Sequence, residues 1–326
     1  MTEDSKSLDY SDAVEYLFEA VSMPDIEGTA LRAARAAGRI HLKRLRRISI
    51  ELKASNPIDL VTEADREAEG AISAILRRRF PTHSILAEEG SAETRPAPHR
   101  WIVDPLDGTT NFAHSYPQFS VSIAYEQHGR VLFAVVYDAL KKEMFSAARG
   151  KGARLNGKPI RVSRTAAISS SLLGTGFPYD RRLRPRFYLT FWEAFLLRCQ
   201  GIRRTGSAAL DLANVACGRI DGFWEFGLKP WDVAAGALLV REAGGRVTNM
   251  DGSPLDLAGG KIVASNGRFH RQMLGTIAMA WPEAERRQRE ADETGNPLAP
   301  PTAGIQSSPR AAEAPATQGR GQARDR

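Results

Sequence analysis

Four carboxylates in this sequence stand at the ends of predicted strands and helices, where they could act together at one edge of a fold. They are Glu88, Asp104, Asp107 and Asp232. Asp104 and Asp107 follow the apolar run 101–103, which is typical of a buried strand, and Gly108 closes a tight loop behind them. An unpaired charge at a buried strand end is costly, and hard divalent cations are the usual means of neutralising clustered anionic oxygens. The sequence therefore predicts a cation-binding site.

Each carboxylate also has a structural explanation when it is taken alone. Asp232 is the natural N-cap of a predicted buried helix within 229–245, and Glu88 could belong to a solvated turn. Asp65 follows Thr62 with the spacing of a capping box. Asp104 is harder to explain in this way, because three apolar residues come directly before it.

The residues after Asp107 are suited to holding a phosphate. Thr109, Thr110 and Asn111 can open a helix, whose first N–H groups bind anions. Hydrolysis of a phosphate monoester needs up to roughly 10²¹-fold acceleration, of which one general base supplies about 10²–10⁴. A pair of cations held by carboxylates can activate water and stabilise the leaving oxygen. The six histidines show no metal spacing with one another, which argues against zinc.

The elements that must position these groups alternate between helix and strand. In the first half, the periodicity predicts a helix over 27–46, a weak strand over 48–52, a helix behind Asp65 that ends at Phe80, and a strand over 84–87. Runs at 119–125, 131–137 and 142–147 predict an antiparallel meander, followed by a connection over 150–164. In the second half we expect strands at 171–175, 202–205, 221–226, 246–249 and 261–264, and helices within 186–199, 206–218 and 229–245. The fold class is α/β, with mixed α and β elements.

Composition bounds the class of protein. The chain has 326 residues, of which 42% are hydrophobic and 25% charged, so it can bury a sizeable core as one domain or two packed halves. No apolar run is long enough to span a bilayer, and the acidic N-terminus lacks the features of a signal peptide. Cys199 and Cys217 suggest neither a disulfide framework nor a metal site. We expect a soluble cytoplasmic protein with no membrane partner.

The net charge of +7 raises the possibility of a polyanionic partner. Part of the excess lies in the arginine-rich stretch 181–186 and in the C-terminal tail. Neither has the interleaved aromatic residues of an RNA-binding signature, so a solvated surface is the favoured interpretation. Binding of nucleic acid or of the transcription apparatus stays open as an alternative.

Four motifs, in order, resemble those of the inositol monophosphatase family, and the similarity runs from about residue 28 to 280. They are Asp59-Leu-Val-Thr-Glu-Ala-Asp65, Glu88-Glu89, Asp104-Pro-Leu-Asp-Gly-Thr-Thr-Asn-Phe112, and Trp231-Asp-Val-Ala-Ala-Gly236 with the following Glu-Ala-Gly-Gly. The resemblance implies a layered αβαβα sandwich with largely antiparallel sheets, a homodimer and inhibition by Li⁺. On this basis we expect an N-terminal extension at 1–26, a catalytic domain at 27–282 with halves at about 27–165 and 166–282, and a disordered tail at 283–326.

The resemblance also implies the metal ligands, which would hold two or three Mg²⁺ ions. Glu88, Asp104 and the carbonyl of Leu106 are similar to the ligands of one ion, and Asp104, Asp107 and Asp232 to those of a second. A third, weaker metal region would involve Lys53 and Asp65, although we favour helix capping as the main role of Asp65.

Roles in catalysis and substrate binding are carried over in the same way. Glu88 and Thr109 would orient and deprotonate the attacking water, and Gly108 with Thr109 would hold the phosphate. The groups that would contact the ring hydroxyls of the substrate are Asp107, which also has a catalytic role, Glu225, and the N–H of Ala208 at the start of the Gly206-Ser207-Ala208 helix. Asp232 is a further substrate-binding residue. The expected substrate is myo-inositol 1-phosphate. Histidinol phosphate, fructose 1,6-bisphosphate and 3′-phosphoadenosine 5′-phosphate are alternatives.

The sequence departs from the family pattern in two places. Ala87 stands where the family usually has glycine before the Glu-Glu pair, which affects a loop and leaves Glu88 in place. The loop at 53–57 is about a residue longer than is common, which weakens the assignment of Lys53.

Overall fold

The computed structural model describes residues 22–45, 50–52, 60–90 and 98–293. Most of the expected N-terminal extension, Lys53 with its loop, and the chain beyond residue 293 lie outside these ranges. Within them, no helix is both long and apolar enough to cross a membrane.

Seven strands form the first sheet, in the order β3-β4-β5-β6-β7-β8-β9. They are β3 (Ser84–Ala87), β4 (His99–Asp107), β5 (Ser120–Gln127), β6 (Arg130–Asp138), β7 (Glu143–Ala148), β8 (Ala153–Leu155) and β9 (Lys158–Ile160). Only β3 and β4 run parallel, and every other neighbouring pair is antiparallel. The predicted meander is therefore confirmed. β5 is buried at every position except its last, and β6 is largely buried from Phe133 onward, because helices cover both faces of the sheet.

The expected connection at 150–164 was wrong in part, because it contains the hairpin of β8 and β9. Two residues, Asn156 and Gly157, join these strands, and both have positive φ (49° and 79°). An Asn-Gly pair between short strands is a strong local signal for such a turn.

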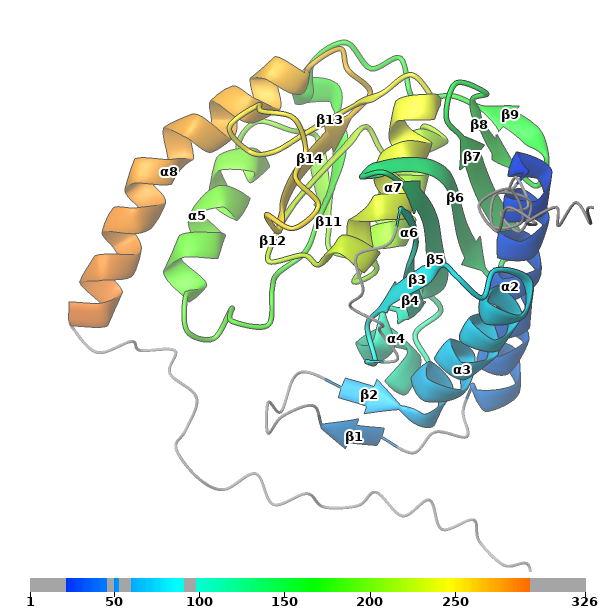
Figure 1. Ribbon diagram of the computed structural model, residues 1–326. Coiled ribbons are helices and arrows are strands. Elements are labelled where there is room, and N and C mark those ends of the chain that lie inside the picture. The colour runs from blue at the N-terminus through cyan, green and yellow to red at the C-terminus, as the bar shows by residue number, and fades with distance from the viewer. Residues whose placement is uncertain (1–21, 46–49, 53–59, 91–97, 294–326) are drawn as a thin grey trace, which may run out of the picture.

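Two helices cover one face of the first sheet, as Figure 1 shows. α2 (Met23–Arg44) is capped by Ser22 and packs alanines and Ile26 into the core. α3 (Glu63–Arg79) begins with the capping box that the sequence predicts between Thr62 and Asp65. A two-stranded antiparallel pair, β1 (Ile50–Leu52) and β2 (Leu60–Thr62), leads into α3. α2 starts four residues before the expected boundary at residue 27.

Five strands form the second sheet, in the order β11-β10-β12-β14-β13. They are β10 (Leu172–Thr175), β11 (Gly201–Arg203), β12 (Gly222–Phe226), β13 (Arg246–Thr248) and β14 (Lys261–Ser265). β10 is parallel to β11 and β12, whereas β14 is antiparallel to both of its neighbours. A short 3₁₀ helix, η1 (Ile168–Ser170), leads into this sheet.

Two apolar helices separate the sheets. α6 (Ala208–Ala216) and α7 (Pro230–Glu242) share one buried cluster with side chains from both sheets, including Phe145 and Phe223. α5 (Pro185–Leu196) and α8 (His270–Glu293) cover the outer face of the second sheet and lie side by side (Figure 1). The order of layers is therefore α, β, α, β, α, as the resemblance implied.

α8 corrects the expected limits of the C-terminal tail, because it continues to Glu293 and makes residues 283–293 helical. The charged residues that begin near position 284 suggested an end near residue 282. The helix persists because Ala284, Gln288 and Ala291 are buried. Tertiary packing can outweigh the cost of a proline inside a helix.

Candidate active site

A cavity of about 450 Å³ lies where the two halves of the fold meet. Its walls come from the ends of β3 and β4, from α4 (Thr109–Ala113), and from β12 and the starts of α6 and α7. Of the predicted site residues that the structure describes, all except Asp65 line it: Glu88, Asp104, Leu106, Asp107, Gly108, Thr109, Gly206, Ser207, Ala208, Glu225 and Asp232. Groups up to 144 residues apart in the sequence therefore line the same cavity.

The loop that carries the two aspartates leaves the regular sheet. The register between β4 and β5 shifts between Asp104 and Asp107, so the intervening backbone is free to turn toward the cavity. The amide of Leu106 donates to Asp104 Oδ1 at 2.9 Å, and His41 Nε2 lies 2.9 Å from the carbonyl oxygen of Pro105. Burial lowers the pKa of His41 to about 4, so the ring is neutral and its Nε2–H donates to this carbonyl. His41 thus supports the aspartate loop from α2.

The carboxylates of the cavity repel one another. Burial raises the pKa of Asp104 well above its usual value, and Glu88, Asp107 and Asp232 raise it further. Burial likewise raises the pKa of Asp232, with a contribution from Glu88. Within the ranges that the structure describes, no lysine or arginine forms an ion pair with any of the three aspartates. Lys229 opposes the rise in the pKa of Asp232 from nearby, but within the described residues no direct ion pair neutralises the three aspartates.

The donor set fits a hard cation that completes its shell from other sources. Over the described residues, no three His, Cys, Asp or Glu side chains form a closed group that could hold a metal ion by themselves. Mg²⁺ rarely uses such a cage. It usually binds one or two carboxylates, keeps several waters and takes the remaining oxygens from substrate phosphate. Excess carboxylate charge around an open cavity meets that requirement.

Gly108 makes the turn that places Asp107 on one side of the cavity and the start of α4 on the other. Its φ of 96° is in the left-handed region, where glycine is favoured. A Cβ at this position would lie 2.9 Å from the carbonyl oxygen of Gln118 and 3.3 Å from that of Gly206. The turn therefore requires glycine for its conformation and for its close approach to the second half of the chain.

Asp65 contacts the site indirectly, through Thr109. Its Oδ2 accepts from the amide of Thr62 at 2.8 Å, which confirms the predicted cap, and its Oδ1 accepts from Thr109 Oγ1 at 2.9 Å. The same hydroxyl lies 3.1 Å from the carbonyl oxygen of Leu106. Burial, opposed by these hydrogen bonds, raises the pKa of Asp65 to about 6. At neutral pH Asp65 is therefore a buried acceptor for the Thr109 hydroxyl.

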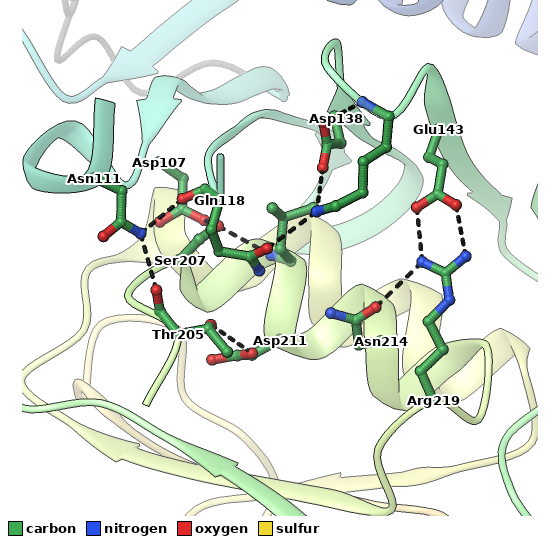
Figure 2. A network of polar contacts seen from close by, with 12 residues as sticks. Asp107, Asn111, Gln118, Asp138, Glu143, Thr205, Ser207, Asp211, Asn214 and Arg219 are labelled. Atoms are coloured by element: carbon green, nitrogen blue, oxygen red, sulfur yellow. Dashed lines mark hydrogen bonds and ion pairs between the residues drawn. The ribbon is translucent and has the colours of Figure 1, made fainter. Parts of the chain in front are cut away.

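The start of α6 binds Asp107 across the cavity. Asp107 Oδ2 accepts from the hydroxyl of Ser207, the N-cap of α6, and from the amide of Ala209 at 2.9 Å (Figure 2). Burial raises the pKa of Asp107 to about 6, against the effect of these donors. Asn111, which was predicted only to open a helix, reinforces this junction by donating from Nδ2 to the carbonyl of Gln118 at 2.7 Å and that of Thr205 at 2.9 Å (Figure 2).

Glu225 closes the far side of the cavity from β12. Burial raises its pKa well above the usual value, and Arg204 opposes that rise. A Cβ on Gly176 would lie 2.0 Å from Glu225 Oε1, so glycine at that position makes room for the carboxyl group.

Asp232 occupies the third position of α7, and the predicted N-cap role was wrong by three residues. The N-cap is Lys229, whose amide donates to Asp232 Oδ2 at 2.6 Å. Pro230 fixes the first turn and displaced the start of the helix from the expected residue.

Among the described residues, three cations also line the cavity, and none of them was predicted as a site residue. Arg181, Arg204 and Lys229 lie among the lining residues, together with Tyr179. The arginine-rich stretch 181–186 was interpreted as solvated surface, but Arg181 faces the cavity and is only partly exposed. The positive charge of the stretch did not by itself indicate that Arg181 faces the cavity.

Comparison with known proteins is consistent with this geometry. The model of the "Inositol monophosphatase family" matches residues 23–284. An "Inositol-1-monophosphatase" of Synechocystis sp. is 52% identical over 227 residues, which is 68% of this chain and 77% of that protein. A "Nus factor SuhB" of Pseudomonas aeruginosa is 47% identical over 264 residues, covering 79% of this chain and 97% of that protein. The solved "Inositol monophosphatase" from Anabaena superposes with a TM-score of 0.70 at 45% identity, over 77% of this chain and 94% of that one.

Proposed function

This chain belongs to the inositol monophosphatase family, and we propose that it is a Mg²⁺-dependent phosphomonoesterase whose preferred substrate is myo-inositol 1-phosphate. Family membership supports phosphatase activity in general. The observation that carries the finer proposal is the gathering of Glu88, Asp104, Asp107 and Asp232 around one cavity, beside the Gly108 turn. Carboxylates in excess beside the start of a helix suit cations and a phosphate bound together.

The metal-holding groups in this proposal are Glu88, Asp104 and the Leu106 carbonyl for one ion, and Asp104, Asp107 and Asp232 for a second. All of them line the cavity. Bound Mg²⁺ would supply Lewis-acid stabilisation of phosphate charge and a more acidic bound water. The high pKa values of the aspartates imply that binding displaces protons from the site, since a ligating carboxylate must be ionised.

Thr109 is the group through which this chain would handle the proton of the attacking water. Because its hydroxyl hydrogen points to Asp65 Oδ1, the lone pairs of its oxygen are free to accept a hydrogen bond from water. Glu88 faces the same cavity and would orient the water from the other side. The amides of Gly108 and Thr109 would hold phosphate oxygens at the start of α4.

The alcohol part of the substrate would lie between α6 and β12. The Ala208 amide and the Ser207 hydroxyl stand on one side and Glu225 on the other, all at the cavity wall. Burial raises the pKa of the Glu225 carboxyl well above its usual value, which favours the protonated form, and that form can donate as well as accept a hydrogen bond. A polyol hydroxyl, which does both, is well matched to such a pair.

The substrate is tested by comparing phosphate release from four esters at equal concentration: inositol 1-phosphate, histidinol phosphate, fructose 1,6-bisphosphate and 3′-phosphoadenosine 5′-phosphate. The proposal expects the highest kcat/KM for inositol 1-phosphate and a drop for that ester in Glu225→Ala, which removes the polyol partner. Negligible hydrolysis of inositol 1-phosphate beside brisk hydrolysis of another ester would overturn the substrate assignment and leave the metal chemistry standing.

A second candidate function is binding to nucleic acid or to the transcription apparatus. A relative with 47% identity is named "Nus factor SuhB", and the stretch 181–186 carries four arginines. Salt-dependent binding of an RNA that persists in Asp104→Asn would support this role, because that change spares the arginines. Loss of binding in Asp104→Asn, or binding that salt does not weaken, would argue against a separate basic surface.

The homodimer, the inhibition by Li⁺ and the cytoplasmic location stay proposals from family membership. Light scattering behind size-exclusion chromatography tests the first, and a Li⁺ titration of phosphate release tests the second.

A further inference from the structure

Helix α5 begins beside the cavity without a cap of its own. Its N-cap, Arg184, makes no side-chain hydrogen bond to the first turn, although the first N–H groups of a helix need acceptors. The segment before it, which supplies Phe177, Tyr179 and Arg181 to the cavity wall, is therefore attached to a helix end that needs outside support.

Gln288 of α8 provides that support from another part of the chain. Its Oε1 accepts from the amide of Phe187, in the first turn of α5, at 3.2 Å. Its Nε2 donates to the carbonyl of Leu183 at 3.1 Å and to Asp292 Oδ1 at 2.8 Å. Gln288 is only 5% exposed, so these bonds are made away from water, where an unmade bond is costly.

The segment 177–183, which precedes α5, connects the contacts of Gln288 to the cavity wall. The amides of Leu183 and Arg184 donate to the carbonyl of Asp180, at 2.8 and 3.1 Å, so the segment is a closed turn. The Asp180 carboxylate accepts from the hydroxyl of Tyr188 at 2.8 Å, which ties the turn to α5 a second time. Tyr179 and Arg181, on either side of Asp180, face the cavity.

The supporting turns of α8 lie beyond the region that the family model matches, which ends at residue 284. They are fixed against α5 by Arg287, whose guanidinium contacts Glu193 at 2.6 Å and Glu283 at 2.6 Å. α8 and α5 run side by side over this stretch (Figure 1). This chain thus carries a helical extension whose one buried amide side chain caps the helix that follows the cavity wall.

We propose that Gln288 is a positioning residue for substrate binding, which holds the wall segment 177–183 in place from the C-terminal extension of α8. This inference rests on the proposed function for its kinetic consequence, because the wall faces the alcohol side of the substrate. The carboxylates on the opposite wall belong to elements that Gln288 does not touch. The extension therefore sets affinity for substrate and leaves the metal-binding half unchanged.

The experiment compares wild type with Gln288→Leu, which keeps the apolar stem and removes both hydrogen-bonding groups. Gln288→Glu is the second variant, since it keeps the acceptor for Phe187 and loses the donor to Leu183. Arg286→Ala is the matched control: Arg286 lies two residues away on the exposed side of α8 and pairs with Glu283 and Glu290. Two readouts are used: steady-state kinetics on inositol 1-phosphate over a range of Mg²⁺ concentrations, and the rate of tryptic cleavage after Arg181 and Arg182 in the folded protein.

Cleavage in Gln288→Leu should be faster by roughly tenfold, as expected when a buried backbone donor and acceptor both lose their partner. KM for the substrate should rise by a similar factor, with kcat and the Mg²⁺ dependence unchanged. Gln288→Glu should fall between wild type and Gln288→Leu, and Arg286→Ala should match wild type. Faster cleavage with an unchanged KM would show that the support does not reach the cavity, and unchanged cleavage would show that Gln288 does not hold the segment. Either result overturns the proposal. If wild type hydrolyses no ester, the proposed function fails, while the cleavage rates still decide whether Gln288 holds the segment.

Discussion

Replacing Asp65 by asparagine separates the two roles that the structure gives this carboxylate. The exchange keeps the size of the side chain and an oxygen that can accept from the Thr62 amide. It replaces the acceptor of the Thr109 hydroxyl, now 2.9 Å away, by an amide donor. Thr109 would then accept from the new amide and turn its hydrogen toward the Leu106 carbonyl, 3.1 Å away. The Thr109 hydroxyl would then have no carboxylate to receive its own proton, so it could not take up a proton from water.

The expected cost to catalysis follows from losing general-base assistance, which is worth about 10²–10⁴ in kcat. The effect on stability has the opposite sign. A folded-state pKa of about 6, against an ordinary value of 3.8, means that ionised Asp65 destabilises the fold by about 3 kcal/mol at pH 8. Because the folded pKa is raised, this penalty is absent below pH 4 and grows until the pH passes 6. Loss of the charge-assisted hydrogen bonds, each worth about 1.5–3 kcal/mol, offsets the gain, so the net change at pH 8 is small.

The assay pairs two measurements on Asp65→Asn. Phosphate release from inositol 1-phosphate reports kcat, and urea unfolding in EDTA at pH 5 and pH 8 reports stability without bound cations. We expect kcat to fall by at least about 10²-fold. We also expect the free energy of unfolding of the variant, relative to wild type, to rise by about 1–2 kcal/mol from pH 5 to pH 8. A variant with normal kcat would refute the role given to the Thr109 hydroxyl. A variant whose stability relative to wild type falls with rising pH would refute the raised pKa of the buried Asp65 carboxylate.

Three further perturbations test the scaffold around the site. Gly108→Ala should lower the free energy of unfolding by more than about 1–2 kcal/mol and reduce kcat, because its Cβ meets the Gln118 carbonyl at 2.9 Å and φ is 96°. A variant that unfolds in urea and turns over substrate as wild type does would contradict this. His41→Phe leaves the buried carbonyl of Pro105 without its donor, so it should lower the free energy of unfolding by about 1–3 kcal/mol and weaken Mg²⁺ activation. His41→Gln keeps a donor and should retain more of the stability and more of the activation. Equal losses in the two variants would count against the hydrogen bond. Burial, followed by a neighbouring histidine, lowers the pKa of His83 to about 4, below its ordinary 6.5. The contribution of His83 to stability is therefore complete above pH 6.5 and is lost as the pH falls toward 4. By tryptophan-monitored urea unfolding, His83→Gln should lose less stability than wild type between pH 7 and pH 5, and parallel losses would contradict the lowered pKa.

Much of the site could be predicted because its residues lie at the ends of elements. Strand ends, helix starts and a glycine turn follow from local pattern, and the tight loop after Asp104 forces nearby groups together. The pairing of that loop with the starts of α6 and α7 came from the family resemblance. Nothing in the local pattern around Ser207 indicates that its hydroxyl binds Asp107, 100 residues away.

Side chains that act through tertiary packing were missed. His41 lies on the buried face of an ordinary amphipathic helix, and its contact with the Pro105 carbonyl depends on how α2 crosses the sheet. Asn111 was interpreted as a helix opener, yet its amide joins the two halves of the fold. Long-range partners of this kind leave no periodic trace in a single sequence.

The limits of α8 were misjudged for a related reason. Charged residues after position 283 indicate an exposed tail, but several of them form pairs along one helix, as Arg286 does with Glu283 and Glu290. The buried positions between them, such as Gln288, face α5 rather than solvent. The Asn156-Gly157 turn is a different case, because the Asn-Gly pair that favours such a turn is present in the sequence but no hairpin was predicted from it.

Phosphate release from inositol 1-phosphate, with and without Mg²⁺, in wild type and Asp104→Asn tests the central claim most directly. Asp251→Asn is the control, because Asp251 is an exposed carboxylate in the turn after β13. We expect release by wild type and by Asp251→Asn only when Mg²⁺ is present, and none by Asp104→Asn at any Mg²⁺ concentration. Release that is independent of Mg²⁺, or that persists in Asp104→Asn, would contradict a reaction carried by cations at this carboxylate cluster.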